Sequence, residues 1–395
     1  MISVFDRKED CCGCSACKYV CPTHAIEMVS DQEGFLYPEI NQKLCIDCGL
    51  CKQVCAFQNG YDLSTNFRIP EVYAAKHKKE DIRMSSTSGG AFTAISDFVL
   101  KNEGVIFGVA FDDNMNVIHK AANSSDERDM FKGSKYVQSD LKDVYKEIKE
   151  LLYEGRQVLF TGTPCQTAGL KSFLAKDNTE KLILCDIVCH GVPSPLMWRE
   201  HINHLEGKKR SKVLSYNFRD KLIGWRGVNV TIKLTEKMHK NNSIARTYTN
   251  LYFSHNISRP ACHSCKYTNM ARPSDITIAD FWGIEKYMPE FDDNKGVPVV
   301  LINSAKGKEV FGNIEKELII RRSNERDCLQ PQLREPSKPS PNRSEFWKEY
   351  ESHGYRYVIK KYGGYNLKSI CKIKSKNILD KIGVLSIIRR VRKAR

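Results

Sequence analysis

The chain has 395 residues, of which 41% are hydrophobic and 28% are charged, as in globular proteins and unlike disordered or fibrous ones. No run of about 18 apolar residues occurs, so we expect no membrane-spanning helix. The opening residues MISVFDRKED lack the basic stretch and apolar core of a signal peptide. We therefore expect a cytoplasmic protein of two or three domains.

The basic character of the chain is concentrated at its C-terminal end. Residues 356–395 hold thirteen Lys or Arg and one acid, and so supply +12 of the formal net charge of +15. The rest of the chain holds 49 basic and 46 acidic residues and is nearly neutral. We therefore expect no nucleic acid among the partners.

The chain contains 16 cysteines, nine of them in the first 60 residues. A reducing compartment disfavours structural disulfides, so this number predicts metal or redox chemistry. Eight of the nine form two similar runs, in which three cysteines are spaced by two residues and a fourth follows after three more: Cys11, Cys14, Cys17 and Cys21, then Cys45, Cys48, Cys51 and Cys55.

This spacing predicts two 4Fe-4S clusters with crossed ligation. Three thiolates in one run can hold three corners of a cube, while the fourth is directed to the other cube. Cluster one would then be bound by Cys11, Cys14, Cys17 and Cys55, and cluster two by Cys45, Cys48, Cys51 and Cys21. A pair of zinc sites is the alternative, but tetrahedral zinc does not need this repeated pattern.

The same segment resembles bacterial-type two-cluster ferredoxins, including Pro22 after the first run. It departs from them at Ala56, where the second run usually has proline. Cys12 is left over, and we expect it to be a small spectator residue.

Beyond this segment, the hydrophobic pattern predicts an α/β domain. Short apolar runs read as buried strands, and helical spacing lies between them. We expect strands at 105–109, 158–160 and 182–188, and helices at 91–100, 141–152 and 167–174. A second β-rich portion is expected to include 228–234 and 276–279.

Polar segments suggest the domain boundaries. Residues 61–70 read as a linker ending in Pro70, and residues 331–342 carry four prolines and read as an extended connector. From Phe346 onward the chain is predicted to be helical and basic. The expected organisation is an α+β two-cluster ferredoxin-like domain (1–60), an α/β domain with a β-rich portion (71–330), and a connector with a basic helical tail (331–395).

Four further cysteines follow predicted strands or lie in a polar loop: Cys165, Cys189, Cys262 and Cys265. Singly, Cys165 could be buried packing, and the Cys262–Cys265 pair could be a zinc half-site or a dithiol. Together they supply four thiolates, which could hold a third cluster. The spacing leaves these readings open.

A serine- and glycine-rich turn, which includes Ser88, Gly89 and Gly90, precedes the predicted helix at 91–100. Backbone NH groups at a helix start can bind phosphate, but an ordinary helix cap explains the turn equally well. Neither a GxGxxG motif nor a Walker loop is present.

Six motifs, in this order, resemble the coenzyme F420 hydrogenase/dehydrogenase beta-subunit family: Ser88-Gly89-Gly90, residues 133–137 (GSKYV), 162–166 (GTPCQ), 189–194 (CHGVPS), 218–221 (FRDK), and Cys262-x2-Cys265 with 275–283 (DITIADFWG). The resemblance runs from the ferredoxin-like segment to about residue 320. It implies a flavin-binding α/β domain, FAD, a third 4Fe-4S cluster held by Cys165, Cys189, Cys262 and Cys265, and electron transfer to an organic hydride carrier or substrate.

The resemblance also implies roles for further residues near the flavin. Ser88, Gly89 and Gly90 would lie against FAD, and Lys135 and Tyr136 would line its pocket. His190, Lys135 and Asp280 are the candidate catalytic residues, although His190 and Asp280 could equally be structural. With its fused ferredoxin-like segment and basic tail, the chain is most similar to bacterial members associated with surface-polysaccharide synthesis.

The C-terminal tail places apolar residues at helical spacing among Lys and Arg: Ile378, Leu379, Ile382, Leu385, and Ile387 or Ile388. Such a helix could contact an anionic membrane, in which case the protein would lie at its inner face. A solvated face or a docking helix for a partner is the alternative.

We therefore expect an iron–sulfur flavoprotein oxidoreductase that exchanges electrons with a redox partner protein or ferredoxin and acts on a small-molecule substrate. The alternatives are a non-catalytic electron-transfer subunit, a coenzyme F420-reducing subunit, and a zinc-stabilised binding protein.

Overall fold

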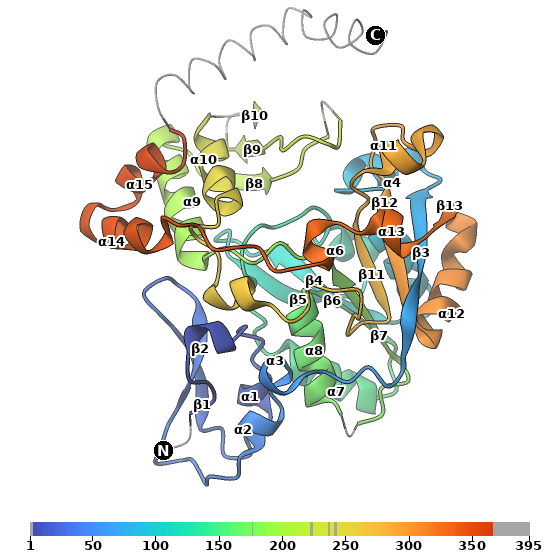
Figure 1. The fold of residues 1–395 in the computed structure, drawn as a ribbon, viewed down its shortest axis with the longest axis horizontal. Helices are drawn as coiled ribbons and strands as arrows, with labels where there is room; N and C mark the ends of the chain where they lie inside the picture. The colour runs from blue at the N-terminus through green and yellow to red at the C-terminus, as the bar shows by residue number, and fades with distance from the viewer. Residues whose placement is uncertain (1–2, 176, 222–223, 236–237, 241–242, 366–395) are drawn as a thin grey trace, which may run out of the picture.

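A computed structural model describes the whole chain except residues 1–2, 176, 222–223, 236–237, 241–242 and 366–395. The ferredoxin-like segment (residues 1–60, described from residue 3) lies at the lower left of the molecule in Figure 1, and helices separate it from a large mixed sheet. A small sheet and a group of helices lie above it. The expected apolar helix of the tail (378–388) lies outside the described residues.

The ferredoxin-like segment is a hairpin with short helices. β1 (Ile26–Ser30) pairs antiparallel with β2 (Leu36–Ile40). Each cysteine run winds through a loop into a single turn of helix, α1 (Ala16–Tyr19) in the first run and α2 (Leu50–Gln53) in the second. The segment also contains η1 (Lys8–Asp10) and α3 (Ala56–Asn59).

The body is built on an eight-stranded sheet in the order β13-β3-β12-β11-β7-β6-β4-β5. Neighbours β4, β6, β7 and β11 run parallel, and the other pairs are antiparallel. The strands are β3 (Asn66–His77), β4 (Val105–Phe111), β5 (Val117–Ala122), β6 (Val158–Gly162), β7 (Leu182–Ile187), β11 (Ile276–Asp280), β12 (Pro298–Ser304) and β13 (Leu318–Ser323).

Helices cover both faces of this sheet. α5 (Ala91–Lys101) and α12 (Ala305–Ile314) bury their apolar residues in one core cluster with the strands. α7 (Val144–Tyr153) and α8 (Pro164–Phe173) share another cluster with the strands and with the ferredoxin-like segment. The segment therefore shares a hydrophobic core with the body, through residues such as Val54 and Phe57.

A three-stranded antiparallel sheet forms the upper left part of the molecule (Figure 1). It consists of β8 (Val213–Asn217), β9 (Thr231–Leu234) and β10 (Met238–Lys240). Four helices pack around it: α9 (Pro195–Lys209), α10 (Ser243–Phe253), α14 (Arg343–His353) and α15 (Tyr355–Lys361).

The remaining elements are short: α4 (Glu80–Ser85), α6 (Ser125–Asp129), η2 (Pro260–Ser264), α11 (Ile284–Tyr287), η3 (Pro289–Phe291), η4 (Glu315–Glu317), α13 (Glu325–Cys328) and η5 (Pro331–Leu333). Among the described residues, none of the helices has the length and apolar character needed to cross a membrane.

The predicted mixed α and β architecture is confirmed, and each strand and helix expected in the α/β domain is present, with ends shifted by a few residues. Three details of the organisation are wrong. The expected linker at 61–70 ends early, because β3 begins at Asn66. Pro70 is tolerated in β3 because it lies where the pairing with β12 shifts register, and so interrupts no regular ladder.

The second wrong detail is the grouping of 276–279 with 228–234. The first becomes β11 in the centre of the large sheet, and the second contributes β9 to the small sheet. The third concerns residues 331–395, which we expected to form a connector and tail. α14 and α15 instead pack into the core of the small-sheet region through Phe346, Tyr355 and Val358.

Candidate functional site

The first cavity, in the ferredoxin-like segment, is lined by cysteines of both runs. Cys11, Cys14 and Cys17 come from the first run, and Cys55 comes from the second. Burial raises the pKa of Cys17 well above its usual value, because a thiolate there loses its hydration and faces neighbouring cysteines. The side-chain amide of Gln58 donates to Cys55 Sγ at 3.4 Å.

The second cavity lies farther out in the same segment. Cys45, Cys48 and Cys51 line it together with Cys21 from the first run. The backbone NH of Ala25 donates to Cys21 Sγ at 3.3 Å, and Cys48 is exposed. The fold therefore brings the eight cysteines together in the two crossed sets that the spacing predicts.

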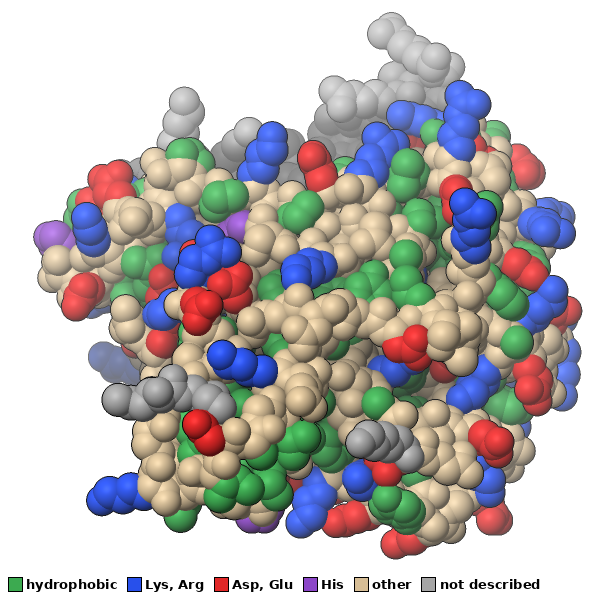
Figure 2. Space-filling model, turned by 60° about the horizontal axis from the view of Figure 1, so that its bottom comes forward, with side chains coloured by type: hydrophobic (Ala, Val, Ile, Leu, Met, Phe, Trp, Pro, Cys, Tyr) green, Lys and Arg blue, Asp and Glu red, His purple; other side chains and the backbone are tan. Residues whose placement is uncertain are grey.

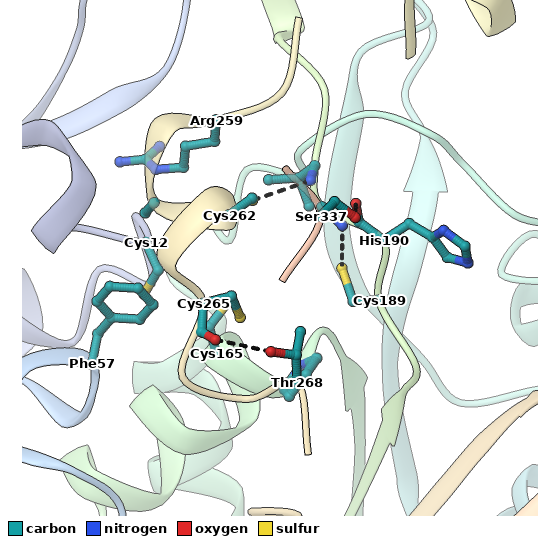
Figure 3. A pocket seen from close by; sticks show the side chains of 14 residues that line it. Cys12, Phe57, Cys165, Cys189, His190, Arg259, Cys262, Cys265, Thr268 and Ser337 are labelled. Carbon is teal, nitrogen blue, oxygen red and sulfur yellow. Dashed lines mark hydrogen bonds between the residues drawn. The ribbon is translucent and has the colours of Figure 1, made fainter. Parts of the chain in front are cut away.

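The third cavity lies between the ferredoxin-like segment and the body (Figure 3). Four cysteines from three separate segments of the body line it: Cys165, Cys189, Cys262 and Cys265. Cys165 lies in the first turn of α8, Cys189 follows β7, and the other two lie in or just after η2.

Local contacts hold these loops in place. A reciprocal cap between Thr163 and Gln166 fixes the start of α8, with the Thr163 NH donating to Gln166 Oε1 at 3.0 Å. Because β6 and β7 are adjacent and parallel, the loops that follow them meet at one edge of the sheet. η2 is tied to the loop after β7 by the Arg259 NH, which donates to the Val192 carbonyl at 3.0 Å.

Burial makes three of the four cysteine positions at this third site unfavourable for bare thiolates, whereas a hydrogen bond from Cys12 lowers the pKa of Cys165 to about 7. Burial raises the pKa of Cys262 to about 11 and that of Cys265 to about 12. Two backbone NH groups point at sulfur, from Gly191 to Cys189 and from Val192 to Cys262, each at 3.4 Å. Four thiolates in such a place need a cationic group among them, and the iron of a cluster supplies it.

The arrangement of the cysteines bears on which metal group fits. Within the part of the chain that the structure describes, no three His, Cys, Asp or Glu side chains converge as ligands of a single metal ion. A 4Fe-4S cube needs four sulfurs placed around a volume, whereas a tetrahedral zinc ion needs four ligands directed at one point.

Cys12, which the sequence left as a spectator, lies between two of the cavities. It lines both the first and the third. Its thiol is hydrogen-bonded with those of Cys14 and Cys165, and these bonds, together with burial, raise its pKa. The spacing of the cysteines in the sequence could not predict this position of Cys12, because it depends on how the ferredoxin-like segment docks on α8.

The candidate flavin residues do not all meet at one place. The Lys135 ammonium is turned back onto its own loop, where it donates to the Met130 carbonyl at 2.8 Å and the Lys132 carbonyl at 3.0 Å. Gly89 is packed against Pro298 with no room for a Cβ, and a Cβ on Gly90 would lie 3.0 Å from His77 Cβ. Packing within the chain therefore explains these two glycines.

Asp280 and Tyr136, by contrast, meet at Arg219. The Arg219–Asp280 ion pair measures 3.1 Å, and its side chains are only 7% and 9% exposed. The Tyr136 hydroxyl accepts from Arg219 at 3.4 Å. Ser88 lies beside Asp280, and its carbonyl accepts from the Lys221 ammonium.

This group, which we term the Arg219–Asp280 centre, has unused hydrogen-bonding capacity. Within the part of the chain that the structure describes, four buried polar atoms here lack a partner: Ser88 Oγ, Arg219 Nε, Asp280 Oδ1 and Trp225 Nε1. The Trp225 and Trp282 rings stack at 5.0 Å, and the Arg219 guanidinium lies over Trp282 at 5.2 Å. Arg219 and Lys221 belong to the motif at 218–221, which is visible in the sequence but predicts no role for either residue.

His190 lines the third cavity and is near enough to Arg219 for the guanidinium to act on its charge. Figure 3 shows its ring pointing away from the cysteines. Burial, followed by repulsion from His255 and Arg219, lowers the pKa of His190 to about 4. The imidazole is therefore neutral at pH 7.

Comparison with family models identifies two regions of the chain. Residues 10–59 match the 4Fe-4S dicluster domain. Residues 155–327 match the C-terminal region of the beta subunit of coenzyme F420 hydrogenase/dehydrogenase. The predicted resemblance to this family is confirmed, and the matches support an iron–sulfur protein related to redox enzymes.

Two individual proteins are also similar. An uncharacterized ferredoxin from Methanocaldococcus jannaschii is 44% identical over 46 residues, which are 12% of this chain and 25% of that protein. The chain thus spans about a quarter of the length of this curated relative. A chain from the F420-reducing [NiFe] hydrogenase complex of Methanosarcina barkeri aligns with a TM-score of 0.45 and 15% identity, covering 78% of this chain and 91% of that one.

Proposed function

Because the chain joins a 4Fe-4S dicluster segment to the C-terminal region of the F420 hydrogenase/dehydrogenase beta subunit, we propose that it is an iron–sulfur flavoprotein oxidoreductase. It passes electrons between an external redox partner and an organic substrate or hydride carrier. The observation that carries the proposal is the succession of three cysteine-lined cavities, of which the first and third share Cys12.

In this proposal each cavity holds one 4Fe-4S cluster. Cluster one occupies the first cavity and cluster two the second, each with the crossed ligands named above. The third cluster is held by Cys165, Cys189, Cys262 and Cys265. The buried cysteines and the NH groups directed at sulfur fit this assignment, because both favour a thiolate bound to iron.

The second cavity is the point of exchange with the partner protein. Cys48 is exposed there, and two large apolar side chains beside it are also exposed, Leu44 by 50% and Ile46 by 63%. Figure 2 shows apolar side chains gathered at the lower left, the side of the ferredoxin-like segment. An apolar patch next to a cluster suits a ferredoxin-like partner, because docking there places the two redox groups close together.

The flavin belongs at the Arg219–Asp280 centre, where unpartnered buried polar atoms and stacked tryptophans fit a flat, polar ring system. A bound FAD takes up electrons one at a time and delivers two as a hydride. Here the guanidinium of Arg219 would bind and orient the ring system, while the neutral His190 lines the third cavity.

For the organic substrate, we propose only a chemical class. The resemblance to members associated with surface-polysaccharide synthesis suggests a substrate from that process. Neighbouring genes for sugar-transfer enzymes are the expected setting, and neighbouring hydrogenase genes would favour a coenzyme F420-reducing subunit.

Anaerobic purification tests the proposal. We expect brown protein with about twelve iron atoms per chain, a flavin spectrum, and turnover of a small substrate with reduced ferredoxin. Clusters without flavin or turnover would indicate an electron-transfer subunit that needs a partner enzyme. Colourless protein containing zinc would show that the three-cluster assignment is wrong.

A further inference from the structure

Arg259 is buried between the first and third cavities, with 0% of its surface exposed. Its Nε donates to the Cys11 carbonyl at 2.8 Å, and its Nη2 lies 3.7 Å from Cys11 Sγ. The same side chain lines the third cavity beside Cys262 (Figure 3). One guanidinium therefore borders the ligands of both sites.

Among the described residues, Arg259 differs from the other buried arginines of the body in having no carboxylate partner. Arg272 pairs with Asp186 at 3.1 Å, and Arg219 pairs with Asp280 at 3.1 Å. Within the described residues, the partners of Arg259 are all neutral: the Gln138 Oε1 at 2.9 Å, the Leu36 carbonyl at 3.0 Å, and the Tyr37 ring at 4.2 Å. A buried cation without a counter-charge is costly, so an anionic group is expected beside it.

The surrounding chain is shaped to hold the guanidinium in place. Gly13 has a φ of +72°, and a Cβ there would lie 2.8 Å from Arg259 Nη1. The Gln138 amide, which accepts from Arg259, donates in turn to the Cys12 carbonyl at 3.0 Å. The loop of the first cysteine run and the guanidinium thus form one hydrogen-bonded unit.

A 4Fe-4S cluster with four thiolates supplies the missing negative charge. Its net charge is about −2 when oxidised and about −3 when reduced. A nearby positive charge therefore stabilises the reduced form more than the oxidised form, and low exposure to solvent strengthens the effect.

We propose that Arg259 is a shared positive charge for cluster one and the third cluster, and that it raises the reduction potential of both. The proposal rests on the three-cluster function above. Because one charge acts on both sites, their potentials rise together, and the difference between the two potentials changes little. Within the described residues, none of the contacts of Arg259 involves the second cavity, so its charge acts mainly on cluster one and the third cluster.

Redox titration of the full-length protein, followed by EPR, tests this role in two variants. In Arg259→Gln we expect the ratio of reduced to oxidised form, at a fixed potential, to fall tenfold or more at cluster one and the third cluster. A tenfold change corresponds to about 59 mV for a one-electron couple. Arg259→Lys keeps the charge and should shift the same two clusters less. Cluster two serves as the internal control and should not move.

The outcomes separate this proposal from the function on which it rests. If the parent protein lacks three cluster signals, the proposed function itself fails. If Arg259→Gln holds its full iron and its potentials are unchanged, or if all three clusters shift equally, the shared-charge role of Arg259 is overturned.

A second variant covers the case in which Arg259→Gln loses iron. Gln138→Glu leaves Arg259 in place and puts a negative charge at the 2.9 Å contact. It should lower the same two potentials and spare cluster two. Unchanged potentials in this variant would also overturn the role.

Discussion

The second and third cavities are built in opposite ways. The second is assembled mainly from one short stretch of chain that carries Cys45, Cys48 and Cys51, and it opens to solvent. The third draws four of its cysteines from three segments of the body and lies between the body and the ferredoxin-like segment. The difference separates two tasks: an outer site for exchange with a partner, and an inner site sheltered from water.

Their dependence on the fold differs as well. Three of the four cysteines at the second cavity come from a local loop, in which Gly49 takes a positive φ of 74° before α2, and the fourth, Cys21, comes from the other run of the same segment. The third needs β6 and β7 to pair in parallel and η2 to dock beside them. We therefore expect the inner site to be the more sensitive of the two to changes in the body.

The largest expected effect is the loss of the third cluster alone. Cys165→Ser should remove about four of about twelve iron atoms and leave the two clusters of the ferredoxin-like segment. The measurement is iron content with EPR on anaerobic protein. Cys185→Ser is the matched control, because Cys185 is buried in β7 yet lines none of the three cavities. Full iron content in Cys165→Ser would contradict the assignment.

The second largest effect is expected at the outer site, the second cavity. Ile46→Glu places a charge in the exposed apolar patch beside Cys48 and should weaken docking of a reduced ferredoxin about tenfold, or roughly 1.4 kcal/mol. The rate of cluster reduction at several ferredoxin concentrations gives this value. Ile69→Glu is the control, since Ile69 is equally exposed, at 63%, but lies on β3 in the body. Equal effects of the two variants would rule out a docking patch at the second cavity.

A smaller effect is expected from the Lys135 ammonium. Burial lowers the pKa of Lys135 to about 7, from an ordinary value of 10.5. Between these values the unfolded chain holds a proton that the folded chain has released, so the unfolding free energy rises with pH. Lys135→Met removes this rise. The unfolding free energy of the variant minus that of the parent should therefore be about 1 kcal/mol larger at pH 7 than at pH 9. The effect is no larger because the half-buried ammonium keeps part of its hydration.

Anaerobic denaturant unfolding at the two pH values checks this expectation. Lys146→Met, at a lysine whose side chain is 69% exposed, is the control for removing a positive charge. If the unfolding free energies of Lys135→Met and the parent differ by the same amount at both pH values, the burial of this ammonium has no effect on stability.

The smallest expected effect concerns Cys12. Cys12→Ser should keep about twelve iron atoms, because the four ligands of each neighbouring cluster are complete without it. Cys14→Ser, two residues away, should lose about four. Loss of iron in Cys12→Ser would mean that this thiol is itself a ligand, and that the crossed assignment needs revision.

Much of the fold could be predicted from the sequence because its signals are local. Apolar runs at 158–160 and 182–188 became β6 and β7, and the helical spacing at 91–100 became α5. The prediction was wrong where strand order mattered. Residues 276–279 look like any short apolar strand, and only the pairing of β11 with β7 and β12 places them in the large sheet.

The candidate site also has a part that the sequence predicts and a part that depends on the packing of the fold. Ligand spacing and family resemblance together named twelve cysteines, and the fold gathers them into three sets. The resemblance also named Lys135 for the flavin pocket, yet its ammonium is bonded to its own loop. A motif records which residue type is present, whereas the direction of a long side chain depends on the packing around it.

The amino-acid order alone determined the two crossed cysteine sets, because loops of two or three residues leave the chain few ways to surround a cube. Only the tertiary structure decided that Cys12 and Arg259 lie between two cavities. Arg259 is far along the chain from Cys11, and the two meet through the docking of one segment on another. Contacts of this kind depend on strand order and buried surface, and no local spacing encodes them.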